Sequence, residues 1–153
     1  MTPSKQVESF IRKFDPAVAK LARSVRSAMR KRFPTAVELV YDNYNALAMG
    51  FGSTERVSDV IVSIAVYARG VNLWFMYGRS LPDPKKLLQG SGNQGAFIRV
   101  PDISVLSNPD VDALLRAATK HAKPPLPKTE RGYTVVKSIS AKQRPRRPSK
   151  TRA

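Results

Sequence analysis

The chain has 153 residues, of which 42% are apolar, so it is long enough for one domain with a substantial core and too short for two ordinary ones. It contains no cysteine, which excludes disulfides and thiolate metal sites, and one histidine is too few for the familiar zinc sites. The formal net charge is +16, and residues 1–35, 36–122 and 123–153 carry +7, 0 and +9 of it. The excess charge therefore lies at the two ends, where it either meets a polyanion or only keeps the protein in solution.

The N-terminal segment is amphipathic and lacks the continuous apolar stretch of a signal peptide. No apolar run approaches the roughly 18 residues that a membrane span requires. Together with the absence of cysteine, these features predict a cytoplasmic protein without membrane contact.

Two helices are predicted first. Apolar residues recur at three- and four-residue spacing over residues 3–14, and Asp15 followed by Pro16 marks the start of a second helix that ends before Pro34. The basic residues of the second helix lie opposite its apolar face: Lys20, Arg23, Arg26, Arg30 and Lys31. Such a stripe is usually a solvated helix face, and contact with phosphates is the alternative.

Four strand-like segments follow, at residues 36–41, 46–52, 60–67 and 71–77. Their connectors are too short for the crossover that parallel neighbours require, so we expect an antiparallel meander. A helical turn within residues 81–89 and a fifth strand at 95–100 come next. A last helix begins at Pro109, after Asn108, and extends to about residue 122.

The remaining chain is less regular. Residues 123–140 are expected to form an extended linker with an edge strand at 133–139, and residues 141–153 to be a disordered basic tail, because they have little to bury. The predicted fold class is thus α+β. Two N-terminal helices and one C-terminal helix pack on a mainly antiparallel sheet of about five strands, within a domain of residues 1–122.

Alternation along the strands predicts two different sides of this sheet. The side that the helices cover is large and apolar, and Val37, Leu39, Tyr41 and Val60 are expected on it. The other side carries small residues, a few aromatic residues and Glu38. It is either a second packing surface covered by the C-terminal part of the chain or a shallow pocket.

The candidate ligand-binding residues are taken from that second side and from the chain segments next to it. Aromatic rings would stack on a ligand, amides would form hydrogen bonds, and an arginine would supply charge. The candidates are Tyr41, Asn43, Tyr44 and Asn45 at one end, and Tyr67, Asn72, Trp74 and Arg99 along the base.

The segment GSGNQG, residues 90–95, has the glycine spacing of a dinucleotide-binding loop. That motif requires a strand before the glycines and a helix after them, so that phosphates lie on the helix N-terminus. Here a helical turn is expected before them and a strand after them. We therefore interpret Gly90 as a helix-ending glycine with positive φ, followed by a turn into a strand.

No catalytic set is recognisable. His121 lies at the end of the last helix, where an imidazole usually complements the helix dipole, and no cysteine or second histidine can complete a triad. The carboxylates are scattered over loops and helix starts. We expect a protein without enzymatic activity.

Residues 41–100 carry a resemblance that no single motif provides. The segments YDNYNALAMGFG, RGVNLWFMYG and LPDPKKLLQGSG, with the closing strand before a leucine-rich helix, resemble the YdhG-like family of small bacterial domains. The resemblance implies an α+β domain in the cytoplasm, without an established activity. Some members are described as frataxin-like iron chaperones, which implies iron as a cargo held by grouped carboxylates. The acids of this chain are dispersed, so no metal ligand is assigned.

Two functional hypotheses follow. The first is a non-enzymatic binding or chaperone-like module that takes a small ligand or a partner protein on the concave side of the sheet. The alternative is an auxiliary nucleic-acid-binding protein that uses the basic helix stripe, Lys20, Arg23, Arg26, Arg30 and Lys31, together with the tail residues Arg144, Arg146 and Arg147.

Overall fold

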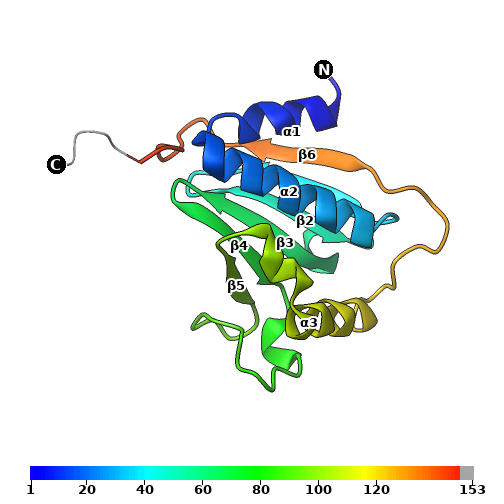
Figure 1. The fold of residues 1–153 in the computed structure, drawn as a ribbon. Coiled ribbons are helices and arrows are strands. Elements are labelled where there is room, and N and C mark those ends of the chain that lie inside the picture. Colours follow the sequence, from blue (N-terminus) through cyan, green and yellow to red (C-terminus); the bar gives the residue numbers. More distant parts are fainter. Residues whose placement is uncertain (149–153) are drawn as a thin grey trace.

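A computed structural model describes residues 1–148 of the chain, and within them three α-helices cover one side of a six-stranded sheet (Figure 1). The helices are α1 (Pro3–Ile11), α2 (Pro16–Arg32) and α3 (Pro109–Lys120). The strands are β1 (Val37–Asp42), β2 (Leu47–Gly52), β3 (Val60–Tyr67), β4 (Gly70–Phe75), β5 (Ala96–Val100) and β6 (Thr134–Ile139). This arrangement confirms the α+β class.

The sheet has the strand order β5-β4-β3-β2-β1-β6. The first five strands form the expected antiparallel meander, whereas β6 pairs with β1 in parallel and makes the sheet mixed. The chain reaches β6 by a long connection that leaves α3 and passes around the end of the sheet (Figure 1). The predicted edge strand is therefore the sixth strand of the sheet.

The helix starts follow the capping residues in the sequence. Thr2 accepts the Lys5 N–H at the start of α1, and Asn108 accepts the Asp110 N–H at the start of α3. Asp15 occupies the cap position of α2, but its side chain makes no capping bond. Its carboxylate lies 3.8 Å from Arg147 instead.

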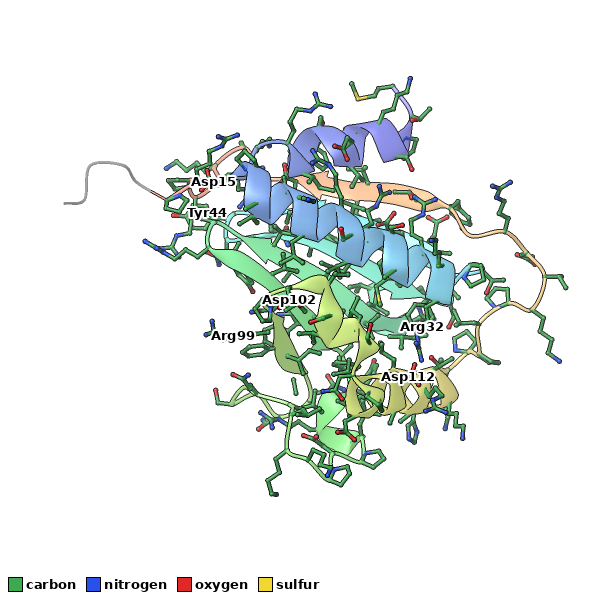
Figure 2. The ribbon with its side chains drawn as sticks, viewed as in Figure 1. Asp15, Arg32, Tyr44, Arg99, Asp102 and Asp112 are labelled. Carbon is green, nitrogen blue, oxygen red and sulfur yellow. The ribbon has the colours of Figure 1, made fainter. Side chains whose placement is uncertain are left out.

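The main core lies between the helices and one side of the sheet, which we call the helix face. Leu47, Ile64, Leu73 and Phe75 are fully buried there against α2 and α3. The Arg32 guanidinium on α2 lies 2.7 Å from the Asp112 carboxylate, which joins α2 to α3 (Figure 2). No helix within residues 1–148 is both long enough and apolar enough to cross a membrane.

The expected face of β1 is wrong. Val40 pairs with Met49 on the helix face, so Val37, Leu39 and Tyr41 lie on the opposite side of the sheet. Alternation gives the two faces of each strand, but the turn decides which face of β1 joins which face of β2. The four-residue turn aligns odd-numbered residues of β1 with even-numbered residues of β2.

The same register brings two carboxylates to the helix face. Glu38 was expected on the other side, but it is 2% exposed and accepts two hydrogen bonds of 2.8 Å from Arg26. Asp42 is fully buried on that face as well. Burial of a carboxylate is tolerated where a cation and hydrogen bonds compensate the lost hydration, as they do here.

A β-bulge changes the side on which Val60 lies. The register of β2 and β3 shifts after Phe51, so Gly52 pairs with Val60 and Val60 packs with Leu39 away from the helices. The expectation that Val60 belongs to the helix face is wrong. A Cβ on Gly52 would lie 2.5 Å from the Asp59 carbonyl oxygen, so this close approach requires glycine.

The C-terminal segment also differs from expectation. Residues 141–148 were expected to be disordered, yet Arg146 is only 7% exposed and forms an ion pair with Asp42 at 2.9 Å. Its guanidinium lies over the Phe14 ring at 5.6 Å. The rest of the predicted tail, residues 149–153, lies outside the described residues.

Candidate functional site

The side of the sheet opposite the helices, which we call the open face, has small residues in the middle and large ones at its margins. One row across five strands is Phe97, Trp74, Ser63, Gly50 and Leu39. The next row is Arg99, Asn72, Ala65, Ala48 and Tyr41. Ala48, Ser63 and Ala65 are small, so the surface is hollowed between Trp74 and the β1–β2 turn. Gly50 does not add to this hollow, because the side chain of Val60 lies against it.

Two adjoining hollows occupy this face. The larger one, of about 540 Å³, contains Ala48, Ala65 and Trp74 together with the β1–β2 turn. The second, of about 430 Å³, extends over the β3–β4 turn and the end of β5. Tyr67 lines both hollows and so joins them. Within residues 1–148 no helix packs over this face.

The structure brings most of the predicted binding residues together. Asn43, Tyr44, Asn45, Tyr67 and Trp74 line the larger hollow, whereas Asn72 and Arg99 line the second one. Tyr41 lies on the same face opposite Ala48, but it does not line either hollow. Figure 2 shows Tyr44 and Arg99 at the same end of the sheet.

Phe97 is the important residue that the sequence interpretation missed. Its ring lies 4.7 Å from the Trp74 ring, centroid to centroid, at an angle of 38°. We call Trp74 and Phe97 the aromatic pair. The alternation that places Arg99 on this face also places Phe97 there, so the pattern within residues 95–100 was sufficient to find it.

The β1–β2 turn at the end of the larger hollow is held by the C-terminal segment. Arg146 donates hydrogen bonds to Asp42 Oδ1 at 2.9 Å and to the Asn43 carbonyl at 2.6 Å. The Arg144 backbone N–H donates to the Tyr44 carbonyl at 2.9 Å. The position of the turn residues that face the hollow therefore depends on residues 144–146.

Asp42 is the titratable group beneath this turn. Burial alone would raise its pKa, but the hydrogen bonds from Lys13 and Arg146 favour the charged carboxylate more strongly, so the pKa lies below its ordinary value. The Lys13 ammonium lies 2.9 Å from the second carboxylate oxygen. Asp42 is thus an ionised structural group below the site, and it does not face the hollow.

The two hollows of the open face have no acidic groups in their lining. Neither hollow has an aspartate or glutamate in its lining, whereas Arg69 and Arg99 both line the second one. Both arginines are exposed, and no ion pair among the described residues involves them. Their guanidinium groups are consequently available to an anion.

The basic residues of the alternative hypothesis are arranged differently. On the α2 stripe, Arg23 lies 2.6 Å from Glu8, and Arg26 and Arg30 lie 2.8 and 3.9 Å from Glu38. These carboxylates partly neutralise the stripe and leave Lys20 and Lys31 exposed at its margins. In the C-terminal segment, Arg146 and Arg147 are engaged by Asp42 and Asp15, and the side chain of Arg144 is exposed.

The GSGNQG segment forms the loop that leads into β5. Gln89 pairs with Phe97 where a helical turn was expected. The interpretation of Gly90 as a helix-ending glycine is therefore wrong. The positive φ of Gly90 is confirmed at 112°, and Arg79 Nε donates to the Gly92 carbonyl at 2.9 Å. A strand follows the glycines, so this loop lacks the helix N-terminus that a dinucleotide site requires. It packs instead against the ring of Phe97.

Other chemistry is sparse in the part of the chain that the structure describes. No three histidine, cysteine, aspartate or glutamate side chains gather into a group that could hold a metal ion there. His121, at the end of α3, lines a cavity of about 210 Å³ together with Asp59, Tyr77 and Lys123.

These features define the class of protein: an α+β domain whose helices cover one side of a mixed sheet and whose other side carries two hollows with aromatic residues and no acids in their lining. Comparisons with protein-family models, with curated proteins and with solved structures find no match. The resemblance to the YdhG-like family therefore stays a prediction from the sequence.

Proposed function

We propose that this protein is a binding module without catalytic activity, and that its ligand lies on the open face of the sheet. The observation that carries the proposal is the uncovered aromatic surface next to a hollow of about 540 Å³. A sheet face normally buries its apolar side against another layer. An uncovered face that combines aromatic rings, amides and unpaired guanidinium groups has the composition of a recognition surface.

The hollow supports recognition of a ligand with flat rings. Trp74 presents its indole beside the small side chains of Ser63 and Ala65, which leave space above the sheet. Asn43 and Asn45 place amide groups at one end, and each amide can both donate and accept hydrogen bonds. Stacking and hydrogen bonding at these positions are sufficient for binding and involve no reacting group.

Trp74 is the only tryptophan in the chain, so its fluorescence reports on this surface alone. We expect compounds that raise the melting temperature in a thermal-shift screen to change the Trp74 emission as well, because they bind beside the indole. Substitution Trp74→Leu should abolish the stabilisation by these compounds. Ligands that stabilise the protein equally in the Trp74→Leu variant would contradict the proposal and would direct attention to the cavity beside His121.

A further inference from the structure

We propose that the ligand of the open face is a single-stranded nucleic acid, whose bases stack on the aromatic side chains and whose phosphates contact Arg69 and Arg99. This inference rests on the proposed function, because it names the class of ligand for the same surface. It also differs from the alternative drawn from the sequence, which placed nucleic acid on the α2 stripe and the tail.

The spacing of the aromatic residues favours a ligand with several rings. The aromatic pair lies on β4 and β5, whereas Tyr41 lies on β1 and Tyr44 on the turn that follows it. Strands β3 and β2 separate Trp74 from Tyr41, which corresponds to three strand spacings or about 14 Å. A ligand that reaches both groups needs at least two flat rings on a connecting chain. An oligonucleotide has this form, whereas a mononucleotide carries one base.

The small residues between the two aromatic groups leave room for that connecting chain. Ala48, Ser63 and Ala65 line the larger hollow in the middle of the open face and project little above the sheet. Base stacking on aromatic side chains tolerates any sequence, because every base has a π face. The hollow therefore suits an extended strand whose bases turn toward the protein at its two margins.

The charges of the open face suit a polyanion. Arg69 and Arg99 are exposed, lack ion-pair partners among residues 1–148, and lie beside Asn72 in the second hollow. Arg144 lies next to the turn that carries Tyr44, because its backbone N–H donates to the Tyr44 carbonyl, and its side chain is exposed. No carboxylate in the lining of either hollow repels phosphate. The net charge of +16 adds a long-range attraction that speeds encounter with a nucleic acid.

The same features disfavour a duplex. Stacking on Trp74 requires a base that is free of its own neighbours, and the bases of a duplex are already stacked and paired. A shallow aromatic sheet face is a known means of binding unpaired bases, in which the aromatics stack two or three of them. Single strands of RNA and of DNA share this chemistry, so both serve as probes.

The test uses the full chain and fluorescein-labelled 12-nucleotide probes, oligo-U and oligo-dT, with a 12-base-pair duplex for comparison. We expect fluorescence anisotropy to show that both single strands bind more tightly than the duplex, and each single strand to quench Trp74 over the same concentration range. The logarithm of the affinity should fall linearly with the logarithm of salt concentration, by about 0.7 per phosphate contact on a single strand.

Two double variants with equal changes in charge locate the surface. Arg69→Gln/Arg99→Gln should lower the salt slope by about 1.4, because two phosphate contacts are lost. Lys20→Gln/Lys31→Gln removes two exposed charges from the α2 stripe and should leave the slope unchanged. Trp74→Leu should weaken binding by roughly 5- to 150-fold, the effect of one lost base stack. If that variant fails to fold, quenching of Trp74 in the unsubstituted protein still reports stacking.

The outcomes separate this inference from the proposed function. Oligonucleotide binding that fails to quench Trp74, or that is lost in the Lys20/Lys31 variant and kept in the Arg69/Arg99 variant, would overturn the inference and support the α2 stripe. No binding of any probe would overturn it as well. The proposed function would then still stand if acidic peptides or small aromatic acids quench Trp74, and it would fall if nothing does.

Discussion

The two faces of the sheet use charged residues in opposite ways. On the helix face, two carboxylates are buried and form ion pairs. Glu38 pairs with Arg26, and Asp42 pairs with Arg146 and Lys13. On the open face no carboxylate lines the hollows, and the arginines there have no ion pair among the described residues. The comparison teaches that a count of basic residues does not locate a binding surface. The acids decide which basic residues remain available, and the register of β1 decides where the acids lie.

The largest expected difference between the faces is in how much a substitution lowers the free energy of unfolding. Substitutions of two neighbouring residues in β4 compare the faces. Leu73 is fully buried on the helix face, so Leu73→Ala should lower the free energy of unfolding by about 2 to 5 kcal/mol. Trp74→Leu, on the open face, changes a partly exposed side chain and should cost less than Leu73→Ala, with about 0.5 to 1.5 kcal/mol of its loss coming from the contact with Phe97. Urea unfolding of both variants checks this, and equal losses would mean that the open face is a second core.

Removal of Arg146 tests whether the C-terminal segment belongs to the fold. Arg146→Ala leaves buried Asp42 with Lys13 as its remaining cation, so we expect a loss of about 3 kcal/mol, at the low end for a broken buried pair. Arg144→Ala is the matched control, since its side chain is exposed and its backbone hydrogen bond is retained. That variant should change stability by less than about 0.5 kcal/mol. A loss below 1 kcal/mol for Arg146→Ala, measured by urea unfolding, would show that the segment is dispensable.

The pH dependence of stability tests the buried ion pair of Asp42 and Arg146 from the side of the carboxylate. The pKa of Asp42 lies below its ordinary value of 3.8 in the folded protein, so its stabilising charge is fully present above that value and is lost as the pH falls through the folded pKa. Asp42→Asn should therefore be about 3 kcal/mol less stable than the unsubstituted protein at pH 7. This gap should narrow as the pH falls below about 4, because the unfolded chain then binds a proton at Asp42 that the folded protein binds only at lower pH. A gap that stays constant from pH 7 to pH 3, measured by urea unfolding at each pH, would contradict the assigned pKa.

The smallest effect concerns the loop beside the aromatic pair. Gly90 has a φ of 112°, and a Cβ there would lie 3.4 Å from the Phe97 ring, so Gly90→Ala should cost about 1 kcal/mol and shift the Trp74 emission. Gly92→Ala is the matched control in the same loop, because Gly92 does not have a positive φ in this range. If both variants behave alike in thermal unfolding and in fluorescence, the loop does not position the aromatic pair.

Local patterns in the sequence were sufficient for most of the fold. Period-two segments and short connectors predict the meander, and Asn108-Pro109 marks the start of α3 as the structure has it. The register of β1 against β2 could not be obtained in this way, because it depends on how the turn after Asp42 closes. The bulge after Phe51, in the pairing of β2 with β3, could not be obtained from alternation either, and its only local sign is Gly52. The role of Arg146 depends on a contact across 104 residues, which no local pattern contains.

The candidate site divides along the same line. Trp74, Tyr67 and Asn72 could be assigned to one side of the sheet from alternation within their own strands. Phe97 could be found by the same reasoning applied to β5. The sequence could not show which basic residues form ion pairs. That depends on which carboxylates the tertiary structure places beside them. From the sequence alone, the α2 stripe therefore remained an alternative place for an anion beside the sheet.

The parallel pairing of β6 with β1 has a consequence for synthesis on the ribosome. The β1 strand emerges early, but β6 and Arg146, which complete its edge and the surroundings of Asp42, are translated after every other element described here. Until then the nascent chain presents an unpaired strand edge, which is a template for pairing with other chains. A translation product that stops before residue 134 would keep that edge permanently. Such a fragment would be a substrate for chaperones and proteases, so the order of translation links production of the full domain to its solubility.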